Sequence, residues 1–279
     1  MPDAGIVILM IAGGAAAGLF GSLLGLGGGI LIVPLLTFGF GLPLREAVGV
    51  SLVAVIVTSS AAASVYLERH VANLRLGMSL ELFTATGALI GGTVAFLLSE
   101  QILAGLFTVL LVYTALTMAR RREPVPTDVP TVDEAPAPDP ASGSPSGSSP
   151  ASGIPPYAVH HLGLGIVGSL FAGVVSALLG IGGGIIKVPL MNIAMGVPLR
   201  VATATSNLMI GITAAASAII YLLRGGIDPY VAGPTAVGVF LGASLGSRTA
   251  HRVDVRVLRL MFVAVLLVTA WQMAGRAFR

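Results

Sequence analysis

Two blocks of the sequence match each other without a gap at a distance of 155 positions. The blocks, Leu23–Leu67 and Leu178–Leu222, are identical at 21 of 45 positions. The identical positions include residues that bend or break helices: Gly25, Gly27, Gly28, Gly29, Pro34, Gly41, Pro43, Arg45, Ser51 and Tyr66, matched by Gly180, Gly182, Gly183, Gly184, Pro189, Gly196, Pro198, Arg200, Ser206 and Tyr221. This pattern predicts two homologous halves with a helix break at the same place in each.

The chain is too apolar to present a polar surface to water. Of its 279 residues, 55% are hydrophobic and only 10% are charged, with a mean hydropathy of +0.96, whereas soluble domains carry about 25% charged residues. Several apolar runs approach or exceed about 18 residues, enough for a helix to cross a hydrocarbon layer of about 30 Å. The runs lack the alternation of barrel strands, so we predict an all-α, polytopic membrane protein.

Each half is expected to contain five apolar helical elements. The expected ranges are 4–24, 29–41, 45–67, 76–98 and 102–119 in the first half, and 158–179, 184–196, 200–222, 230–250 and 256–275 in the second. The second element of each half has only 13 residues, which span about 20 Å as a helix. Short segments after a glycine break, at corresponding places in both halves, are typical of discontinuous helices at a transport site. The number of spans is eight or ten, depending on whether these segments cross.

A segment of different composition separates the halves. Residues 120–156 begin with Arg-Arg-Arg-Glu and continue mainly with Pro, Ser, Gly and Ala, which cannot bury enough apolar area to fold. We therefore divide the chain into a first transmembrane repeat (1–119), a disordered linker (120–156) and a second transmembrane repeat (157–279). The first apolar run is expected to be a retained helix and not a signal peptide, because it lacks a basic start.

The arginines indicate how the halves are oriented. If the short elements cross, the halves are inverted and four arginines lie opposite the linker: Arg45, Arg224, Arg276 and Arg279. Ten then lie on the linker's side: Arg69, Arg75, Arg120, Arg121, Arg122, Arg200, Arg248, Arg252, Arg256 and Arg259. If the short elements dip into the membrane and return, the halves are parallel, and eight arginines lie on one side of the membrane and six on the other. The positive-inside rule favours the inverted arrangement with a cytoplasmic linker.

Several classes of chemistry find no support. The chain has no cysteine, and its four histidines, His70, His160, His161 and His251, lack metal-ligand partners at helical spacing, so we expect interfacial histidines and no metal site. The sequence contains no stripe of basic residues with interleaved aromatic residues, the pattern that would indicate binding to nucleic acid. No carboxylate pair or catalytic triad can be placed on one membrane face, so we expect neither an enzyme nor a cofactor.

The glycine motifs are candidates for binding an anion. Gly27, Gly28 and Gly29, and their counterparts Gly182, Gly183 and Gly184, lack the Gly-Lys-Ser/Thr ending of a nucleotide-binding loop. Close packing of helices through small residues is the alternative explanation. A helix that starts after such a break directs its positive dipole end at the turn, which suits an anion.

The remaining candidates are polar residues in apolar segments. Lys187 is the only lysine, and an ammonium within a span costs about 2.5–3.5 kcal/mol, so it should have a partner. It either reaches an interface or binds an anionic substrate. Ser51 and its equivalent Ser206, together with Asn207, are further substrate-binding candidates. Glu81 is either a proton-relay residue or an interfacial acid.

These motifs resemble the sulfite exporter TauE/SafE family. The resemblance rests on Gly-x-Gly-Gly-Gly, Val-Pro-Leu, Gly-x-Pro-x-Arg-x-Ala and a small-residue helix ending in Tyr, in both halves. The family implies transport of small sulfur-containing anions, such as sulfite, thiosulfate or sulfoacetate, across the bacterial cytoplasmic membrane.

We therefore expect a secondary transporter of such an anion, with alternating access and proton coupling. A passive anion channel, a transporter of an unrelated small anion and a membrane scaffold that acts through the linker are the alternatives. The expected partners are the small anion and membrane lipid, and a homodimer is compatible with the sequence.

Overall fold

The structure is a computed structural model that describes residues 4–24, 28–68, 72–120, 159–249 and 255–277, which form helices and short connections. The first half contains α1 (Ala4–Leu24), α2 (Gly29–Pro34), the π-helix η1 (Leu35–Gly39), α3 (Leu44–Glu68), α4 (Leu74–Ala95) and α5 (Glu100–Arg120). The second contains α6 (Leu162–Leu179), α7 (Gly184–Pro189), the π-helix η4 (Leu190–Ala194), α8 (Leu199–Leu223), α9 (Pro229–Thr249) and α10 (Val255–Ala277). Every boundary lies within four residues of the sequence prediction, and the proposed linker falls almost wholly outside the described residues.

The short second element of each half changes its winding at proline. Helix α2 ends at Pro34 and η1 follows, and α7 ends at Pro189 and η4 follows. Proline has no N–H to donate to the preceding turn, and in the second half a wider π-type bond follows, from the Met195 N–H to the Leu190 carbonyl at 3.1 Å. Each proline, one of the helix-breaking residues shared by the two halves, is thus followed by a π-helical turn.

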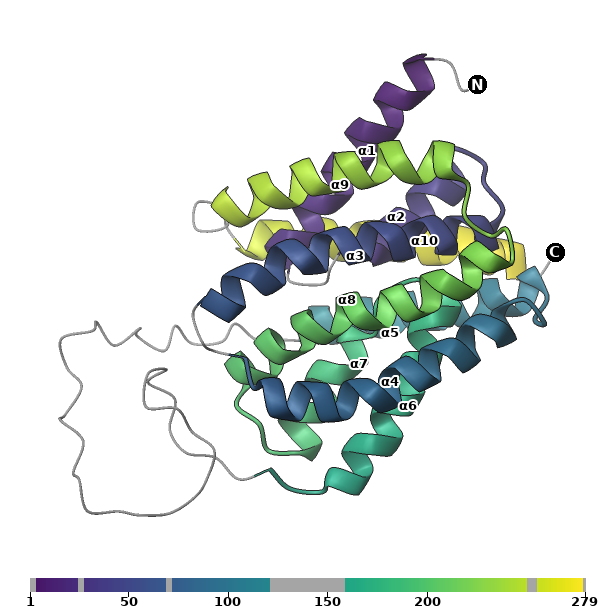
Figure 1. Ribbon diagram of the computed structural model, residues 1–279. Helices are drawn as coiled ribbons and strands as arrows, with labels where there is room; N and C mark the ends of the chain where they lie inside the picture. The colour runs from purple at the N-terminus through teal and green to yellow at the C-terminus, as the bar shows by residue number, and fades with distance from the viewer. Residues whose placement is uncertain (1–3, 25–27, 69–71, 121–158, 250–254, 278–279) are drawn as a thin grey trace, which may run out of the picture.

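The two halves are interlocked through their first and third long helices. Helix α1 packs on α9 and α6 packs on α4, so each half covers the other (Figure 1). Glycines allow the close approach: a Cβ at Gly18 would meet the Val239 carbonyl, and a Cβ at Gly173 would meet the Thr84 carbonyl. These two contacts are equivalent at the 155-residue offset, so the same small-residue packing is used twice.

Equivalent helices of the two halves also pair with each other. Helices α3 and α8 lie side by side and run in opposite directions (Figure 1). Helices α5 and α10 pair as well, and Gly105 in the first turns of α5 lies against Ala277 at the end of α10. These two pairs are therefore antiparallel.

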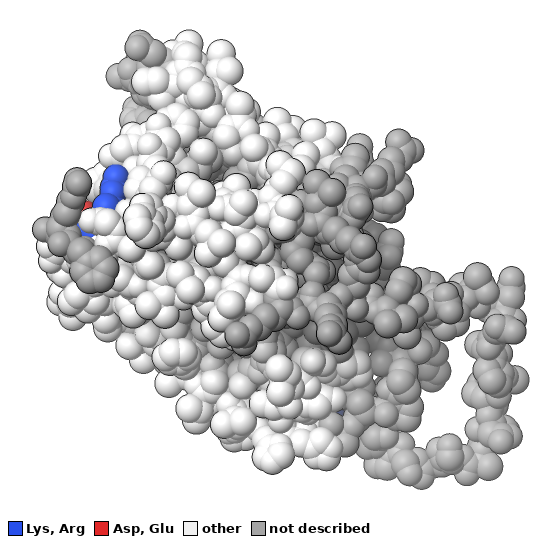
Figure 2. Space-filling view, turned by 180° about the vertical axis from the view of Figure 1, so that it is seen from behind, with Lys and Arg blue, Asp and Glu red and all other residues white. Residues whose placement is uncertain are grey.

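The outer surface suits a lipid environment. Within the described part of the chain, six helices are long and apolar enough to cross a membrane: α1, α4, α5, α6, α8 and α10. Helices α3 and α9 have 25 and 21 residues, which also suffices in length. Figure 2 shows a face almost without charge, apart from a few charged side chains gathered at one edge. Large apolar side chains such as Leu97, Ile193 and Trp271 are highly exposed on the surface, which is stable only in contact with lipid or another apolar partner.

Candidate functional site

Left-handed glycines form the helix breaks. Gly28, which precedes α2, has a φ of 75°, and Gly183, which precedes α7, has a φ of 77°. A side chain is strained in this conformation, so glycine is needed to start both short helices. Gly182 also has a positive φ, of 79°, and Gly27 lies outside the described residues. The predicted breaks are confirmed where the structure describes them.

The two breaks meet at the centre of the molecule. A Cβ at Gly29 would lie 2.6 Å from the Gly180 carbonyl oxygen. The Ser51 hydroxyl lies 2.8 Å from the same Gly180 oxygen and 3.2 Å from the Gly29 carbonyl. Because this buried hydroxyl is committed to backbone carbonyls, Ser51 joins the two halves and has no remaining proton to donate to an anion.

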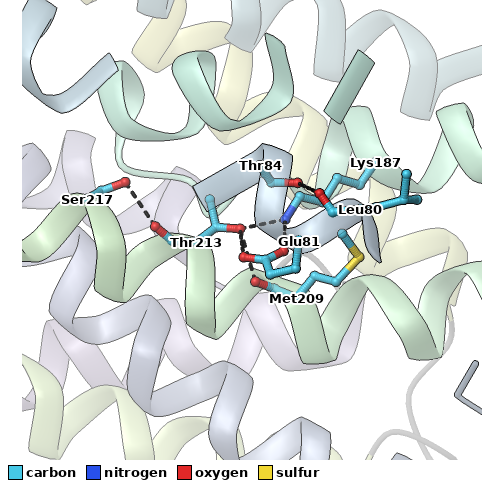
Figure 3. Close-up of polar contacts among 7 residues, drawn as sticks. All are labelled: Leu80, Glu81, Thr84, Lys187, Met209, Thr213 and Ser217. Carbon is cyan, nitrogen blue, oxygen red and sulfur yellow. Dashed lines mark hydrogen bonds and ion pairs between the residues drawn. The ribbon is translucent and has the colours of Figure 1, made fainter. Parts of the chain in front are cut away.

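A buried ionic cluster lies beside the second break. The Lys187 ammonium is 3.1 Å from Glu81 Oε2 and 2.6 Å from the Thr213 hydroxyl oxygen (Figure 3). Thr213 in turn lies 2.7 Å from Glu81 Oε1, to which it donates. The side chains of Lys187 and Glu81 are 1% and 6% exposed. The cluster is sealed from solvent and joins three helices: α4 supplies Glu81, α7 supplies Lys187 and α8 supplies Thr213.

This geometry excludes one of the two alternatives left open for each charged residue. Lys187 does not reach an interface, and Glu81 is not an exposed interfacial acid, because each is buried against the other. Taking two charges out of water costs several kcal/mol per ion, which only close mutual pairing and additional hydrogen bonds can offset. Thr213 supplies one of these bonds to each partner.

Two buried hydroxyls near the second break, Ser176 Oγ and Ser206 Oγ, have no hydrogen-bond partner among the described residues. A Cβ at Gly183 would be 3.3 Å from Ser176 Cβ and 3.6 Å from Lys187 Cε, and a Cβ at Gly184 would be 3.6 Å from Ser206 Oγ. An unpaired buried hydroxyl is unfavourable and calls for an explanation such as a water or a ligand. The second break therefore has a buried cation, paired with Glu81, and two buried hydroxyls that no described residue satisfies.

The first break lacks this chemistry. The polar residues Lys187, Glu81, Ser176 and Asn207 have as their equivalents Ile32, Ala236, Gly21 and Leu52. Among the polar groups of the site, only Thr213 and Ser206 are matched by polar residues, Thr58 and Ser51. The polar half-site thus lies between α4, α6, α7 and α8.

The other candidates differ in how close they come to this half-site. Asn207 is nearly buried on α8, next to Ser206 in the chain, and its side chain makes no hydrogen bond within the described residues. Asn192 instead donates to the Val197 carbonyl at 2.9 Å, and Arg45 donates to the Leu98 carbonyl at 2.8 Å, so both stabilise turns.

Sequence reasoning missed two members of the half-site. Neither Ser176 nor Thr213 was singled out from the sequence. Thr213 does lie 3.0 Å from the Met209 carbonyl, but it also bridges the ionic cluster. Its signal was its identity with Thr58, since these are the only Ser or Thr residues shared by the third elements besides Ser51 and Ser206.

Comparison with known proteins gives consistent matches over nearly the whole chain. A family model described as sulfite exporter TauE/SafE matches residues 10–273. The probable membrane transporter protein YunE of Bacillus subtilis is 24% identical over 273 residues, which cover 95% of this chain and 96% of that protein. A probable membrane transporter protein of Methanocaldococcus jannaschii is 26% identical, with 92% and 91% covered. Another, of Xylella fastidiosa, is 26% identical, with 95% of each chain covered. No solved structure matches the chain significantly.

Proposed function

The chain belongs to the sulfite exporter TauE/SafE family, and from this membership we propose that this multi-pass membrane transporter moves a small sulfur-containing anion across the bacterial cytoplasmic membrane. Sulfite, thiosulfate, sulfoacetate and similar organosulfonates are the substrate class. Transport is secondary, by alternating access, and is driven by protons.

The buried Lys187 ammonium beside the second glycine break carries this proposal. Sulfur oxyanions offer several acceptor oxygens around a compact negative charge, and a cation with hydroxyl donors satisfies both features. In the proposed site, Lys187 supplies the charge and the unpaired Ser176 and Ser206 hydroxyls supply hydrogen bonds. Gly182 and Gly184 lie against the Ile210 side chain, which has to move for an anion to approach their backbone, and Asn207 follows Ser206 in the chain.

The proposed site adjoins the contact between the two halves. Gly29 lies against Gly180 across this contact, and Ser51 ties both carbonyls together. We propose that rocking of the halves about this contact opens the second break to each side in turn. In this account Gly28, Gly29 and Ser51 form the pivot, and the anion is held on the side of Gly182–Gly184.

We further propose that the halves are inverted and that the linker is cytoplasmic. The antiparallel pairs α3–α8 and α5–α10 support inversion, because parallel halves would place equivalent helices in the same direction. The ten arginines on the linker's side support the orientation.

A panel of anions tests the proposed substrate class. Purified protein should be stabilised against thermal unfolding by at least one of sulfite, thiosulfate or sulfoacetate, and not by equal concentrations of sodium chloride. Lys187→Met should lose this stabilisation. An unchanged melting temperature with all three anions would contradict the proposal.

Flux measurements separate a transporter from a channel. Uptake of the stabilising anion into proteoliposomes should saturate with concentration and respond to a pH gradient. Flux that rises linearly and ignores the pH gradient would instead establish an anion channel.

A further inference from the structure

The Lys187–Glu81 pair is already neutral before any substrate arrives. Its side chains face each other at 3.1 Å and are almost fully removed from solvent. An anion that joined Lys187 while Glu81 stayed ionised would leave one surplus negative charge in the protein interior if the anion is monovalent, and two if it is divalent. A proton that joined Glu81 alone would leave Lys187 as a surplus positive charge. Either state is costly, because an unpaired buried charge loses its solvation without compensation.

Binding a proton and an anion together avoids both costs. If the proton neutralises Glu81 while the anion pairs with Lys187, a monovalent anion leaves the cluster neutral, and a divalent anion such as thiosulfate leaves one surplus negative charge instead of two. By linkage, each ligand then raises the affinity for the other. Such thermodynamic coupling is what a proton-driven transporter requires at its binding site.

We infer that Glu81 is the coupling proton site and Lys187 the anion site, so that one proton travels with each anion. This inference rests on the proposed transport function and specifies how it is coupled. A proton from the aqueous phase adds to the Glu81 carboxylate, the ion pair opens, and the freed ammonium takes the anion. On release, the anion leaves, the proton returns to water and the pair closes again.

Thr213 suits both states of this exchange. Its hydroxyl lies 2.7 Å from Glu81 Oε1 and 2.6 Å from the Lys187 nitrogen. A hydroxyl can donate to a carboxylate or accept from a carboxylic acid, so Glu81 keeps a partner in either protonation state. Thr213 also remains an acceptor for Lys187 when Glu81 is neutral.

No other ionisable residue on the helices that pack around the Lys187–Glu81 pair competes with Glu81 as the proton site. Helices α6 and α8 pack against α4, and α7 packs on both α6 and α8. Helix α6 contains no ionisable residue. Helix α8 contains only Arg200 and Tyr221, near its two ends, and Tyr221 donates to the Ala177 carbonyl. On α4 itself, the other charged residue is Arg75, in an exposed part of the first turn. Glu81 therefore responds chiefly to Lys187 and to the anion bound there.

Proton uptake on binding tests the inference directly. Purified full-length protein in weakly buffered detergent solution is mixed with thiosulfate, which has no titration near neutral pH, and a pH dye reports protons taken up. Thiosulfate affinity is measured in parallel between pH 6 and pH 9. Wild type should take up close to one proton per thiosulfate, and its affinity should fall by up to about tenfold per pH unit at the alkaline end.

The matched variants are Glu81→Gln, which keeps the shape and hydrogen bonds of the side chain, and Glu100→Gln, an exposed acid at the start of α5. Elution as a monodisperse peak confirms that each is folded. Glu81→Gln should bind thiosulfate with no proton uptake and no pH dependence, and Glu100→Gln should behave as wild type. Proton uptake that persists in Glu81→Gln, or wild-type binding without protons, would overturn the inference and leave the transport proposal standing. Failure of wild type to bind thiosulfate, sulfite or sulfoacetate at any of these pH values would overturn both.

Discussion

The Ser51 hydroxyl lies 2.8 Å from the Gly180 carbonyl oxygen, a contact between residues 129 positions apart that joins the glycine breaks of the two halves. Its equivalent, Ser206, has a buried hydroxyl that no described residue pairs with. Two serines at identical places in the duplicated sequence thus differ in their contacts: one joins the two halves, and we propose that the other binds the anion.

This difference predicts opposite effects of the same substitution. Ser51→Ala should lower the free energy of unfolding by about 1–3 kcal/mol, because two buried carbonyls lose their donor. Ser206→Ala should leave stability nearly unchanged and weaken binding of the stabilising anion several-fold. Thermal unfolding with and without the anion measures both effects. Equal loss of stability in the two variants would show that Ser206 is structural.

The glycine contacts between the halves predict a strong position dependence along one helix. Gly242→Ala in α9 would place a methyl group against the Ala15 carbonyl, whereas Gly233 in the same helix has nothing within 4 Å of its Cβ position. Gly242→Ala should destabilise the protein by about 1–3 kcal/mol through overpacking. Gly233→Ala should be neutral or stabilising by up to about 1 kcal/mol. Melting temperatures of the two variants check this, and a similar loss in both would contradict the described packing.

The ionic cluster predicts that the stability of the fold depends more on the balance between the Lys187 and Glu81 charges than on the presence of either charge. Lys187→Met alone should cost about 3–5 kcal/mol, because it leaves the Glu81 carboxylate buried without its cation. Adding Glu81→Gln should recover most of this loss. Yield of monodisperse protein and its melting temperature report the effect. If the double variant were no more stable than Lys187→Met, the two side chains would not be paired.

The orientation of the halves can be tested by labelling. Because the chain has no cysteine, a single Cys at Ser146 in the linker or at Ser99 between α4 and α5 gives a clean background. In intact cells, an impermeant maleimide should label Ser99→Cys and not Ser146→Cys. The reverse pattern would contradict a cytoplasmic linker.

The helices were predictable because each depends on local sequence. Apolar runs of membrane-spanning length, ended by Gly, Pro or charged residues, locate the long helices, and the break before α7 follows from three successive glycines. Pro189 marks the change to η4 because it has no N–H to donate to a carbonyl of the preceding turn. Such signals need no knowledge of the remaining fold.

The partners of the helices were not predictable in the same way. The ion pair joins Glu81 to Lys187 across 106 positions, and it forms only because α4 of the first half packs among helices of the second. The repeat shows that two halves exist, but it does not show that they exchange helices. Lys187 was expected to have a partner from its desolvation cost, while the identity of that partner depends on the tertiary fold.

Uptake of radiolabelled thiosulfate into proteoliposomes tests the central claim most directly. The account predicts saturable uptake by wild type, none by the Glu81→Gln/Lys187→Met double variant, and near-normal uptake by Ile32→Met, the matched change in the first half. Wild-type uptake by the double variant would contradict the assignment of the transport site to the second glycine break.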